Sequence, residues 1–390
     1  MTTATPPPLP EPAWAATWTA SRPEVELAWR ATQARCCGDD LGSDPDWCAA
    51  FEQIYPGALR WVRLESGSGY HVLPLRLQRT ELSCCLGELK VLQFHPRVVQ
   101  LAGEQIRLPE SDAAYHCLFA ALLRKRRGWD LLRLTVPVST HLWRWLEQRE
   151  PEALGLRRYQ PAPPVPHDLI EFPPTFSAYA SKFSAKTRKN RERELRHLEL
   201  KGPVRLQCYR SPAEVEPFLA IAGAISRRSY QHKLLQAGLR DPARLRPRLE
   251  TAAAQGWLRA YILWCGDAPC SFMLGYQYKG RYYYACIGYD PEWAKWDAGT
   301  VLHWLALQDM FLHDPPTVFD LGCRGPQKQY FGNSHFEEAT IYYFRPGLYP
   351  WLARSTHAGS LRLTRLCGRW LTRHQLKPRA QRLIRRLRGC

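Results

Sequence analysis

The stretch from Arg281 to Gly332 constrains the fold more than any other part of the sequence. It begins with an aromatic run, 281–289, which is typical of a β-strand and ends at an Asp-Pro pair. An amphipathic segment that starts at Gly299 predicts a helix, and residues 317–321 predict a second strand. When a helix follows a strand in this order, its first turn directs unpaired N–H groups and the positive end of the helix dipole toward that strand. Such a helix start can bind a phosphate group.

The residues before this stretch predict an antiparallel meander. Residues 257–264, 270–278 and 281–289 read as three successive strands joined by tight turns. Helical spacing precedes them at 176–200 and 218–230. Helices, a meander, a helix and a last strand describe an α+β domain.

The first half of the chain also mixes strands with helices. Strands are predicted at 59–64, 71–78 and 89–94, followed by a helix at 111–127 and a buried strand at 129–136. Six prolines between 161 and 174 favour an interdomain connection near residue 165. We therefore expect four parts: a flexible Pro-rich leader, an N-terminal domain, a C-terminal domain and a basic helical tail, at residues 1–23, 24–165, 166–350 and 351–390.

The net charge of +18 favours an anionic partner, such as a nucleotide, nucleic acid or an anionic membrane surface. The basic residues gather at 182–210 and 354–390. The first run is typical of a nucleic-acid contact or of a solvated helix face. The second predicts amphipathic helices with arginine on one face, which suit a membrane surface, a partner protein or a cap on the domain.

The cysteines and histidines do not indicate a metal site. The thirteen cysteines include no C-x-x-C pair, and the histidines form no H-x-x-x-H pair, so we assign no metal and expect reduced thiols. The first 18 residues lack the basic patch and apolar run of a signal peptide, and no window approaches eighteen uninterrupted apolar residues. We expect a cytoplasmic protein, with a peripheral position at the inner face of the membrane as an alternative.

Two groups of residues are candidates for chemistry. Ala298, Gly299 and Thr300 open the predicted helix and either receive a pyrophosphate or form an ordinary helix start. Asp320, at a strand end, and Lys328 and Tyr330, in the glycine-containing loop after it, either clamp an anion and move a proton or form a polar surface loop.

These residues resemble the motifs of the CelD/BcsL-like acetyltransferases of the GNAT superfamily. The motifs occur in the family's order: Gly288-Tyr289-Asp290, Ala298-Gly299, the strand 319–322, and Lys328 followed by Phe331-Gly332. The chain departs from the family pattern at Ala298, where proline is common, and at Gln327, where tyrosine is common.

The resemblance implies two tandem GNAT-like domains, each with a mostly antiparallel central sheet flanked by helices. The N-terminal domain would be degenerate, and the C-terminal one would bind acetyl-CoA or another acyl-CoA as donor. By carry-over, the backbone of Ile287, Gly288 and Tyr289 would pair with the pantetheine arm. Ala298–Thr300 would meet the pyrophosphate, and Lys328 would lie at the acceptor or phosphate end.

The expected function is therefore an acyl-CoA-dependent N- or O-acyltransferase, in which an amine or hydroxyl attacks the thioester directly. Asp320 and Tyr330 are the candidates for proton transfer, and a small molecule or a polysaccharide-pathway compound is the expected acceptor. One alternative is transfer from aminoacyl-tRNA, as in the distantly related FemAB-type enzymes. The other is a non-catalytic scaffold at a membrane surface.

Overall fold

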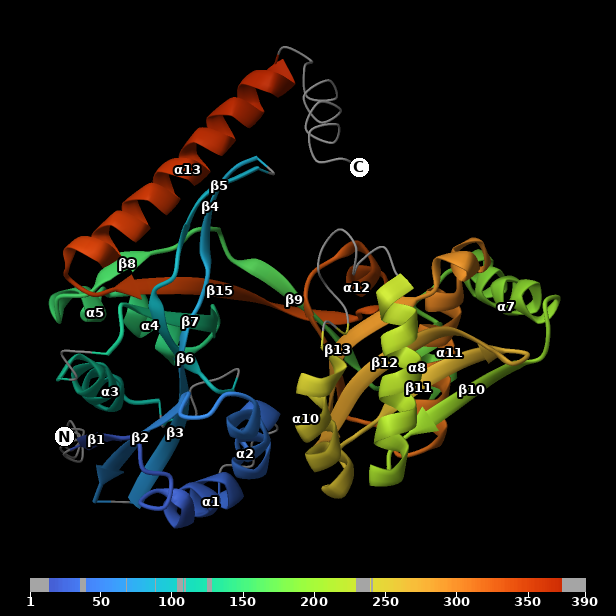
Figure 1. Ribbon diagram of the computed structural model, residues 1–390, viewed down its shortest axis with the longest axis horizontal. Helices are drawn as coiled ribbons and strands as arrows, with labels where there is room; N and C mark the ends of the chain where they lie inside the picture. The colour runs from blue at the N-terminus through green and yellow to red at the C-terminus, as the bar shows by residue number, and fades with distance from the viewer. Residues whose placement is uncertain are drawn as a thin grey trace, which may run out of the picture. The chain divides into compact units, whose positions relative to one another are not determined.

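A computed structural model describes residues 14–35, 40–67, 69–87, 89–103, 108, 110–124, 128–228, 239 and 241–373 (Figure 1). The expected helix within 374–390 and most of the Pro-rich leader lie outside these residues. The chain divides into two compact units. Unit 1 comprises residues 1–36, 57–164 and 337–390, and unit 2 comprises residues 37–56 and 165–336.

Unit 1 is built on a mostly antiparallel sheet. Its strands, in spatial order, are β1 (Ala15–Thr19), β2 (Leu59–Ser66), β3 (Gly69–Arg79), β6 (Arg97–Leu101), β7 (Leu131–Pro137) and the end of β15 (Ser334–Phe344), and β8 (Arg157–Tyr159) also pairs with β15. A hairpin, β4 (Leu82–Leu86) and β5 (Leu89–Phe94), is inserted between β3 and β6. The helices are α1 (Glu26–Arg35), α3 (Asp112–Arg124), α4 (His141–Glu147), α5 (Glu150–Ala153) and α13 (Leu348–Arg373).

The strands of unit 2 are also mostly antiparallel. Its strands run in the order β9 (Val165–Glu171), β14 (Val318–Cys323), β13 (Arg281–Tyr289), β12 (Ala268–Tyr278), β11 (Ala260–Cys265) and β10 (Val204–Tyr209). The α-helices are α2 (Pro45–Ile54), α6 (Phe176–Ala180), α7 (Ala185–Glu199), α8 (Val215–Arg228), α10 (Pro242–Ala254), α11 (Ala298–Leu312) and α12 (Pro326–Phe331). The short 3-10 helices are η1 (Leu41–Ser43), η2 (Pro212–Glu214) and η3 (Pro291–Trp296).

Both units repeat one topology. In unit 2, β13 is followed by α11 and by β14, which pairs with β13 in parallel. In unit 1, β6 is followed by α3 and by the parallel strand β7. Each parallel pair also has an antiparallel neighbour, which comes from a distant part of the chain. Strand β9 follows the unit 1 strands in sequence but pairs with β14, whereas β15 follows β14 in sequence but pairs with β7. The expected α+β class, with mostly antiparallel strands flanked by helices, is confirmed.

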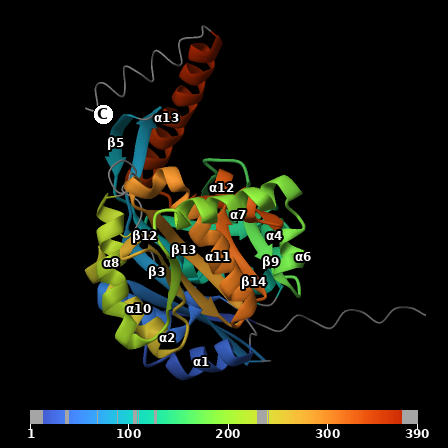
Figure 2. The same ribbon diagram turned by 90° about the vertical axis from the view of Figure 1, so that its right-hand side faces the viewer.

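Helices cover both faces of the unit 2 sheet. On one face, α2, α8 and α10 bury residues such as Trp47, Phe218 and Leu249 against the strands. On the other face, α6, α7 and α11 enclose a second apolar cluster that includes Leu302 and Phe319. Helix α11 lies against β12 and β13 on this face (Figure 2). Because α11 is apolar on nearly all sides, burial holds it in the position that the candidate site requires.

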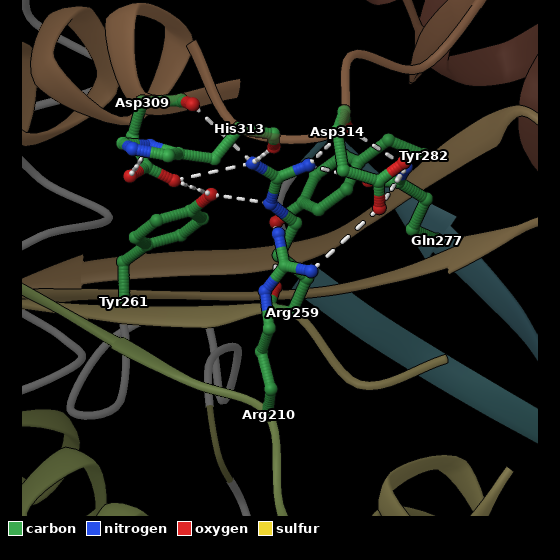
Figure 3. A network of polar contacts seen from close by, with 8 residues as sticks. All are labelled: Arg210, Arg259, Tyr261, Gln277, Tyr282, Asp309, His313 and Asp314. Atoms are coloured by element: carbon green, nitrogen blue, oxygen red, sulfur yellow. Dashed lines mark hydrogen bonds and ion pairs between the residues drawn. The ribbon is translucent and has the colours of Figure 1, made fainter. Parts of the chain in front are cut away.

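The C-terminal end of α11 is held by the buried side chain of Arg259 (Figure 3). Its guanidinium donates hydrogen bonds to the carbonyls of His313 (2.6 Å) and Asp314 (2.7 Å) and to the carboxylate of Asp309 (3.1 Å). Its Nε donates to the hydroxyl of Tyr261, which in turn donates to Asp309. A cation beside the last carbonyls of a helix stabilises that end.

Candidate active site

Strand β13 leaves its parallel neighbour soon after the two begin to pair. It pairs with β12 along its whole length, but with β14 only from Arg281 to Tyr283. A bulge displaces Ala285 from the register with β12. Beyond Tyr283, no strand in the described part of the chain pairs with this edge of β13. The predicted donor residues Ile287, Gly288 and Tyr289 lie on this diverging segment.

The start of α11 lies next to the end of β13. Its first residue, Ala298, is buried, and its carbonyl accepts a 3.0 Å hydrogen bond from the hydroxyl of Ser271 on β12. A methyl group on Gly299 would lie 3.3 Å from the ring of Tyr289, so the glycine admits that ring against the first turn. The N–H groups of Thr300 and Val301 both donate to the carbonyl of Asp297, which leaves the N–H groups of Ala298 and Gly299 outside the helical ladder. The predicted pantetheine and pyrophosphate residues are therefore adjacent.

Gly288 has a packing role in the strand. A methyl group at this position would lie 2.3 Å from Cε1 of Phe272, a fully buried ring on β12. The ring fills the space that a side chain would need. The glycine of the Gly-Tyr-Asp motif is thus required by the core as well as by any ligand.

Lys328 lies at the separation between β13 and β14. Its Nζ is 6.0 Å from the ring centre of Tyr284 on β13, and a methyl group on Gly322 of β14 would lie 3.3 Å from the same Nζ. The sequence predicted a loop here, but Lys328 and Tyr330 belong to the short helix α12, which has proline in its first turn and ends before Gly332.

A buried histidine stacks beside this lysine. The ring of His303 on α11 lies 4.0 Å from that of Phe331, nearly parallel to it, and 5.8 Å from that of Tyr284. Burial lowers the pKa of His303 to about 3, so the imidazole is neutral at neutral pH. Its Nε2 has no protein hydrogen-bond partner among the described residues. The sequence offered no basis for separating this histidine from a structural one.

Asp320 is the centre of a buried ion-pair network. Its carboxylate accepts hydrogen bonds from Nε2 of His167 (2.6 Å), from the guanidinium of Arg281 (2.8 Å) and from the N–H of Gly322 (2.8 Å). Burial alone would raise the pKa of Asp320, but His167 and Arg281 hold it below the usual value. The carboxylate is therefore charged and fully bonded, which makes it a poor proton acceptor.

Tyr330 points toward a different neighbourhood. Its ring packs against Phe183 at 5.1 Å and lies under the guanidinium of Arg191, and burial raises the pKa of its hydroxyl. The C-terminal end of α12 is held by Tyr179 and Lys182, which both donate to the carbonyl of Phe331 at 2.7 Å. Desolvation lowers the pKa of Lys182 to about 8.

The loop between β14 and α12 is fixed by a second buried carboxylate. Arg324 donates through Nε and one terminal nitrogen to Asp168 on β9, at 3.0 and 2.7 Å. The guanidinium of Arg324 thus forms an ion pair within the protein. Arg324 therefore has different surroundings from Lys328, the residue predicted to clamp an anion.

The described residues include no cluster of three or more histidine, cysteine, aspartate or glutamate side chains arranged to hold a metal ion. Within the same residues, no helix combines the length and apolar character needed to cross a membrane.

Comparison with known protein families gives one match, within residues 185–337. Residues 185–337 match the family described as an acetyltransferase (GNAT) domain. They form a GNAT-type domain. This domain includes β13, α11, β14 and α12, and it supports a transferase. A search of curated proteins found no match.

Solved structures resemble the chain over most of its length at low identity. A crystal structure of FemX is 10% identical and has a TM-score of 0.54, with 83% of this chain and 97% of that chain covered. A tandem GNAT protein from the clavulanic acid biosynthesis pathway is 12% identical, with a TM-score of 0.47 and coverage of 86% and 98%. The C-terminal domain of a lysylphosphatidylglycerol synthetase, described as putative, from Agrobacterium fabrum is also 12% identical, with a TM-score of 0.46 and coverage of 85% and 95%. The likeness to FemX concerns the fold.

Proposed function

We propose that the protein is an acyltransferase that moves an acyl group from an acyl-CoA thioester, acetyl-CoA in the simplest case, to an amine or hydroxyl. The observation that carries this proposal is the divergence of β13 from β14 after Tyr283, with the start of α11 beside Tyr289. An exposed strand edge offers N–H and C=O groups to the amides of a pantetheine arm. A helix start offers N–H groups to a pyrophosphate.

In this proposal, the acceptor lone pair attacks the carbonyl carbon of the thioester, and the resulting oxyanion is stabilised by an N–H of the β13 edge and by the ammonium of Lys328. Collapse breaks the C–S bond, and the proton that the attacking amine or hydroxyl loses balances the proton that the departing thiolate takes up. Because Arg281 and the hydrogen bond from His167 hold Asp320 charged, we propose that Asp320 positions these two side chains and does not move a proton. Tyr330 remains the candidate proton donor to the thiolate.

The proposal includes membership of the CelD/BcsL-like acetyltransferases, which rests on the motifs at 288–290, 298–299, 319–322 and 328–332. A compound of a polysaccharide pathway would then be the acceptor. The sequence departures at Ala298 and Gln327 fall within this proposed donor site.

Titration calorimetry with acetyl-CoA tests the donor. We expect saturable heat and a rise in melting temperature that grows with acetyl-CoA concentration. A protein that gives neither heat nor a thermal shift with acetyl-CoA would refute the thioester donor. Thiol release with a panel of amines and sugars then tests the acceptor class.

One observation favours the alternative donor, aminoacyl-tRNA. Helix α7 presents exposed basic residues, including Lys186, Lys189 and Arg193, and lies against η3 and α11. The ring of Trp296 on η3 contacts His197 and Lys201 at the end of this helix. Retention of charged tRNA that weakens steeply with salt would support this donor. Absence of retention at low salt would remove it.

A further inference from the structure

A cluster of arginines in unit 1 lines a groove beside α13. The groove has a volume of about 510 Å³ and lies between α13 and residues 158–161, which include the end of β8. Four arginines line it, Arg158, Arg354, Arg362 and Arg365, and the described residues of its wall include no carboxylate. All of its lining residues belong to unit 1, whereas the proposed donor site belongs to unit 2.

The spacing of residues on α13 builds one wall of this groove. Arg354, Ala358, Arg362 and Arg365 follow one another at intervals of four, four and three, so they share a face of the helix. The small residues Ala358 and Gly359 lie between the arginines, and a methyl group on Gly359 would meet no atom within 4 Å. The guanidinium groups therefore stand on either side of a space that no side chain fills.

Two of the arginines are fixed by the protein. Arg365 donates a 2.8 Å hydrogen bond to the carbonyl of Pro161. Arg158 forms an ion pair with Glu147, and its guanidinium lies 5.7 Å from the ring centre of Trp143. Within the described chain, Arg354 and Arg362 form no ion pair. The cluster thus combines two guanidinium groups that the protein orients, those of Arg158 and Arg365, with two whose positive charge no ion pair among the described residues neutralises, those of Arg354 and Arg362.

The positive charge continues into the neighbouring surface. A second cavity of about 420 Å³ shares Arg158 and Arg354 and adds Arg149 and Arg157, with Glu152 as its one described carboxylate. Like charges at this density repel one another, and a bound anion removes that repulsion. Guanidinium groups match the oxygens of phosphate in pairs, and more strongly than they match a halide.

We propose that the groove between α13 and residues 158–161 binds a phosphate-bearing ligand. The volume exceeds the need of a free phosphate ion and suits an organic phosphate. Such a phosphate has two sources, a soluble metabolite or a lipid headgroup. The headgroup source agrees with the exposed side chains of Leu348 and Trp351, which line an adjoining cavity together with Arg354.

The test compares two double variants of the full chain. The groove variant carries Arg354→Gln and Arg362→Gln. The control variant carries Arg369→Gln and Arg373→Gln, which remove the same charge from exposed positions of the same helix outside the groove. A third variant, Arg354→Lys with Arg362→Lys, keeps the charge and removes the paired hydrogen bonds. Matched circular dichroism spectra and melting curves without phosphate establish that all three fold.

Calorimetry with inorganic phosphate, against sodium chloride at equal ionic strength, gives the first result. We expect saturable binding by the wild type and the control, at least about tenfold weaker binding by the groove variant, and an intermediate affinity for the lysine variant. Equal binding by the groove variant, or no binding by the wild type, overturns the proposal.

Flotation with phosphatidylcholine vesicles, with and without phosphatidic acid, distinguishes the two sources. Flotation that needs phosphatidic acid and is lost only in the groove variant supports a lipid headgroup. Absence of flotation together with groove-dependent phosphate binding supports a soluble phosphate compound. Flotation that the groove variant retains overturns the headgroup as the ligand of this groove.

Discussion

His167 and Asp320 are joined by a 2.6 Å hydrogen bond between Nε2 and Oδ1, and both side chains are buried within unit 2. The two residues come from neighbouring antiparallel strands, β9 and β14. On its other oxygen, Asp320 accepts a hydrogen bond from Arg281 on β13. One carboxylate thus links three adjacent strands at the place where β13 and β14 begin to diverge.

We expect Asp320→Asn to lower the free energy of unfolding by about 3–5 kcal/mol, because it removes the buried negative charge that pairs with the partly buried Arg281 and accepts a hydrogen bond from His167. Urea denaturation measures this change. The exposed Asp267→Asn is the matched control and should shift the free energy by less than about 0.5 kcal/mol. A loss in Asp320→Asn no larger than that of the control would show that the network does not stabilise the fold.

His303 predicts a specific dependence of stability on pH. Its pKa falls from 6.5 to about 3 on folding, so between these values the unfolded chain binds the proton and the folded chain does not. Stability from this group is complete above pH 6.5 and is lost as the pH falls, by about 1.4 kcal/mol per pH unit. Unfolding of the wild type and of His303→Leu should therefore differ in slope between pH 6.5 and 3.

The exposed His335→Leu is the control for this measurement, and its pH profile should parallel that of the wild type. If His303→Leu also gives a parallel profile, the imidazole is not held neutral in the folded protein.

The strand, helix and strand of residues 281–323 could be predicted because their signals are local. The aromatic run ends at Asp290-Pro291, and β13 ends at Tyr289. The helix predicted from Gly299 corresponds to α11, which begins one residue earlier, at Ala298, and is apolar on nearly all sides where an amphipathic helix was expected. Alternation and helix-start residues act within a few positions, so a single sequence carries them.

The partners of these elements could not be predicted in the same way. His167 and Asp320 are separated by 153 positions, and nothing in their neighbourhoods links them. Residues 37–56 belong to unit 2, where Asp44 accepts a hydrogen bond from Tyr278 and the ring of Trp47 packs edge-to-face with that of Tyr276. Such contacts depend on strand order, which local propensity does not encode. The α12 helix did carry a local signal, proline in its first turn and glycine after its end.

Gly288→Ala should destabilise the protein by about 1–3 kcal/mol, because the added methyl group would overlap the buried ring of Phe272. Combining it with Phe272→Leu should cost less than the sum of the two single changes, since the smaller side chain makes room. Gly325→Ala, whose methyl group would meet no atom within 4 Å, is the control. Strict additivity in a denaturation cycle would contradict the overlap.

Arg259→Lys should lower the free energy of unfolding by at least about 2 kcal/mol, although it keeps the charge. A lysine cannot reach the carbonyls of His313 and Asp314 and the hydroxyl of Tyr261 together. Amide hydrogen exchange should rise selectively in the last turn of α11. Tyr261→Phe removes one hydroxyl from the network and should cost about 1 kcal/mol. Unchanged exchange in Arg259→Lys would show that the guanidinium does not hold this helix end.

Lys328→Met tests the proposed transfer reaction itself. If the ammonium stabilises charge that develops on the acyl oxygen, kcat/KM for thiol release from acetyl-CoA should fall by about tenfold to a hundredfold, with little change in melting temperature. Lys328→Arg should restore part of the rate, because it returns the positive charge. Lys90→Met, on the exposed strand β5 of unit 1, is the control and should leave the rate unchanged. A kcat/KM in Lys328→Met equal to that of the wild type would exclude this lysine from the reaction. An equal loss of kcat/KM in Lys90→Met would show that the effect is not specific to the separation between β13 and β14.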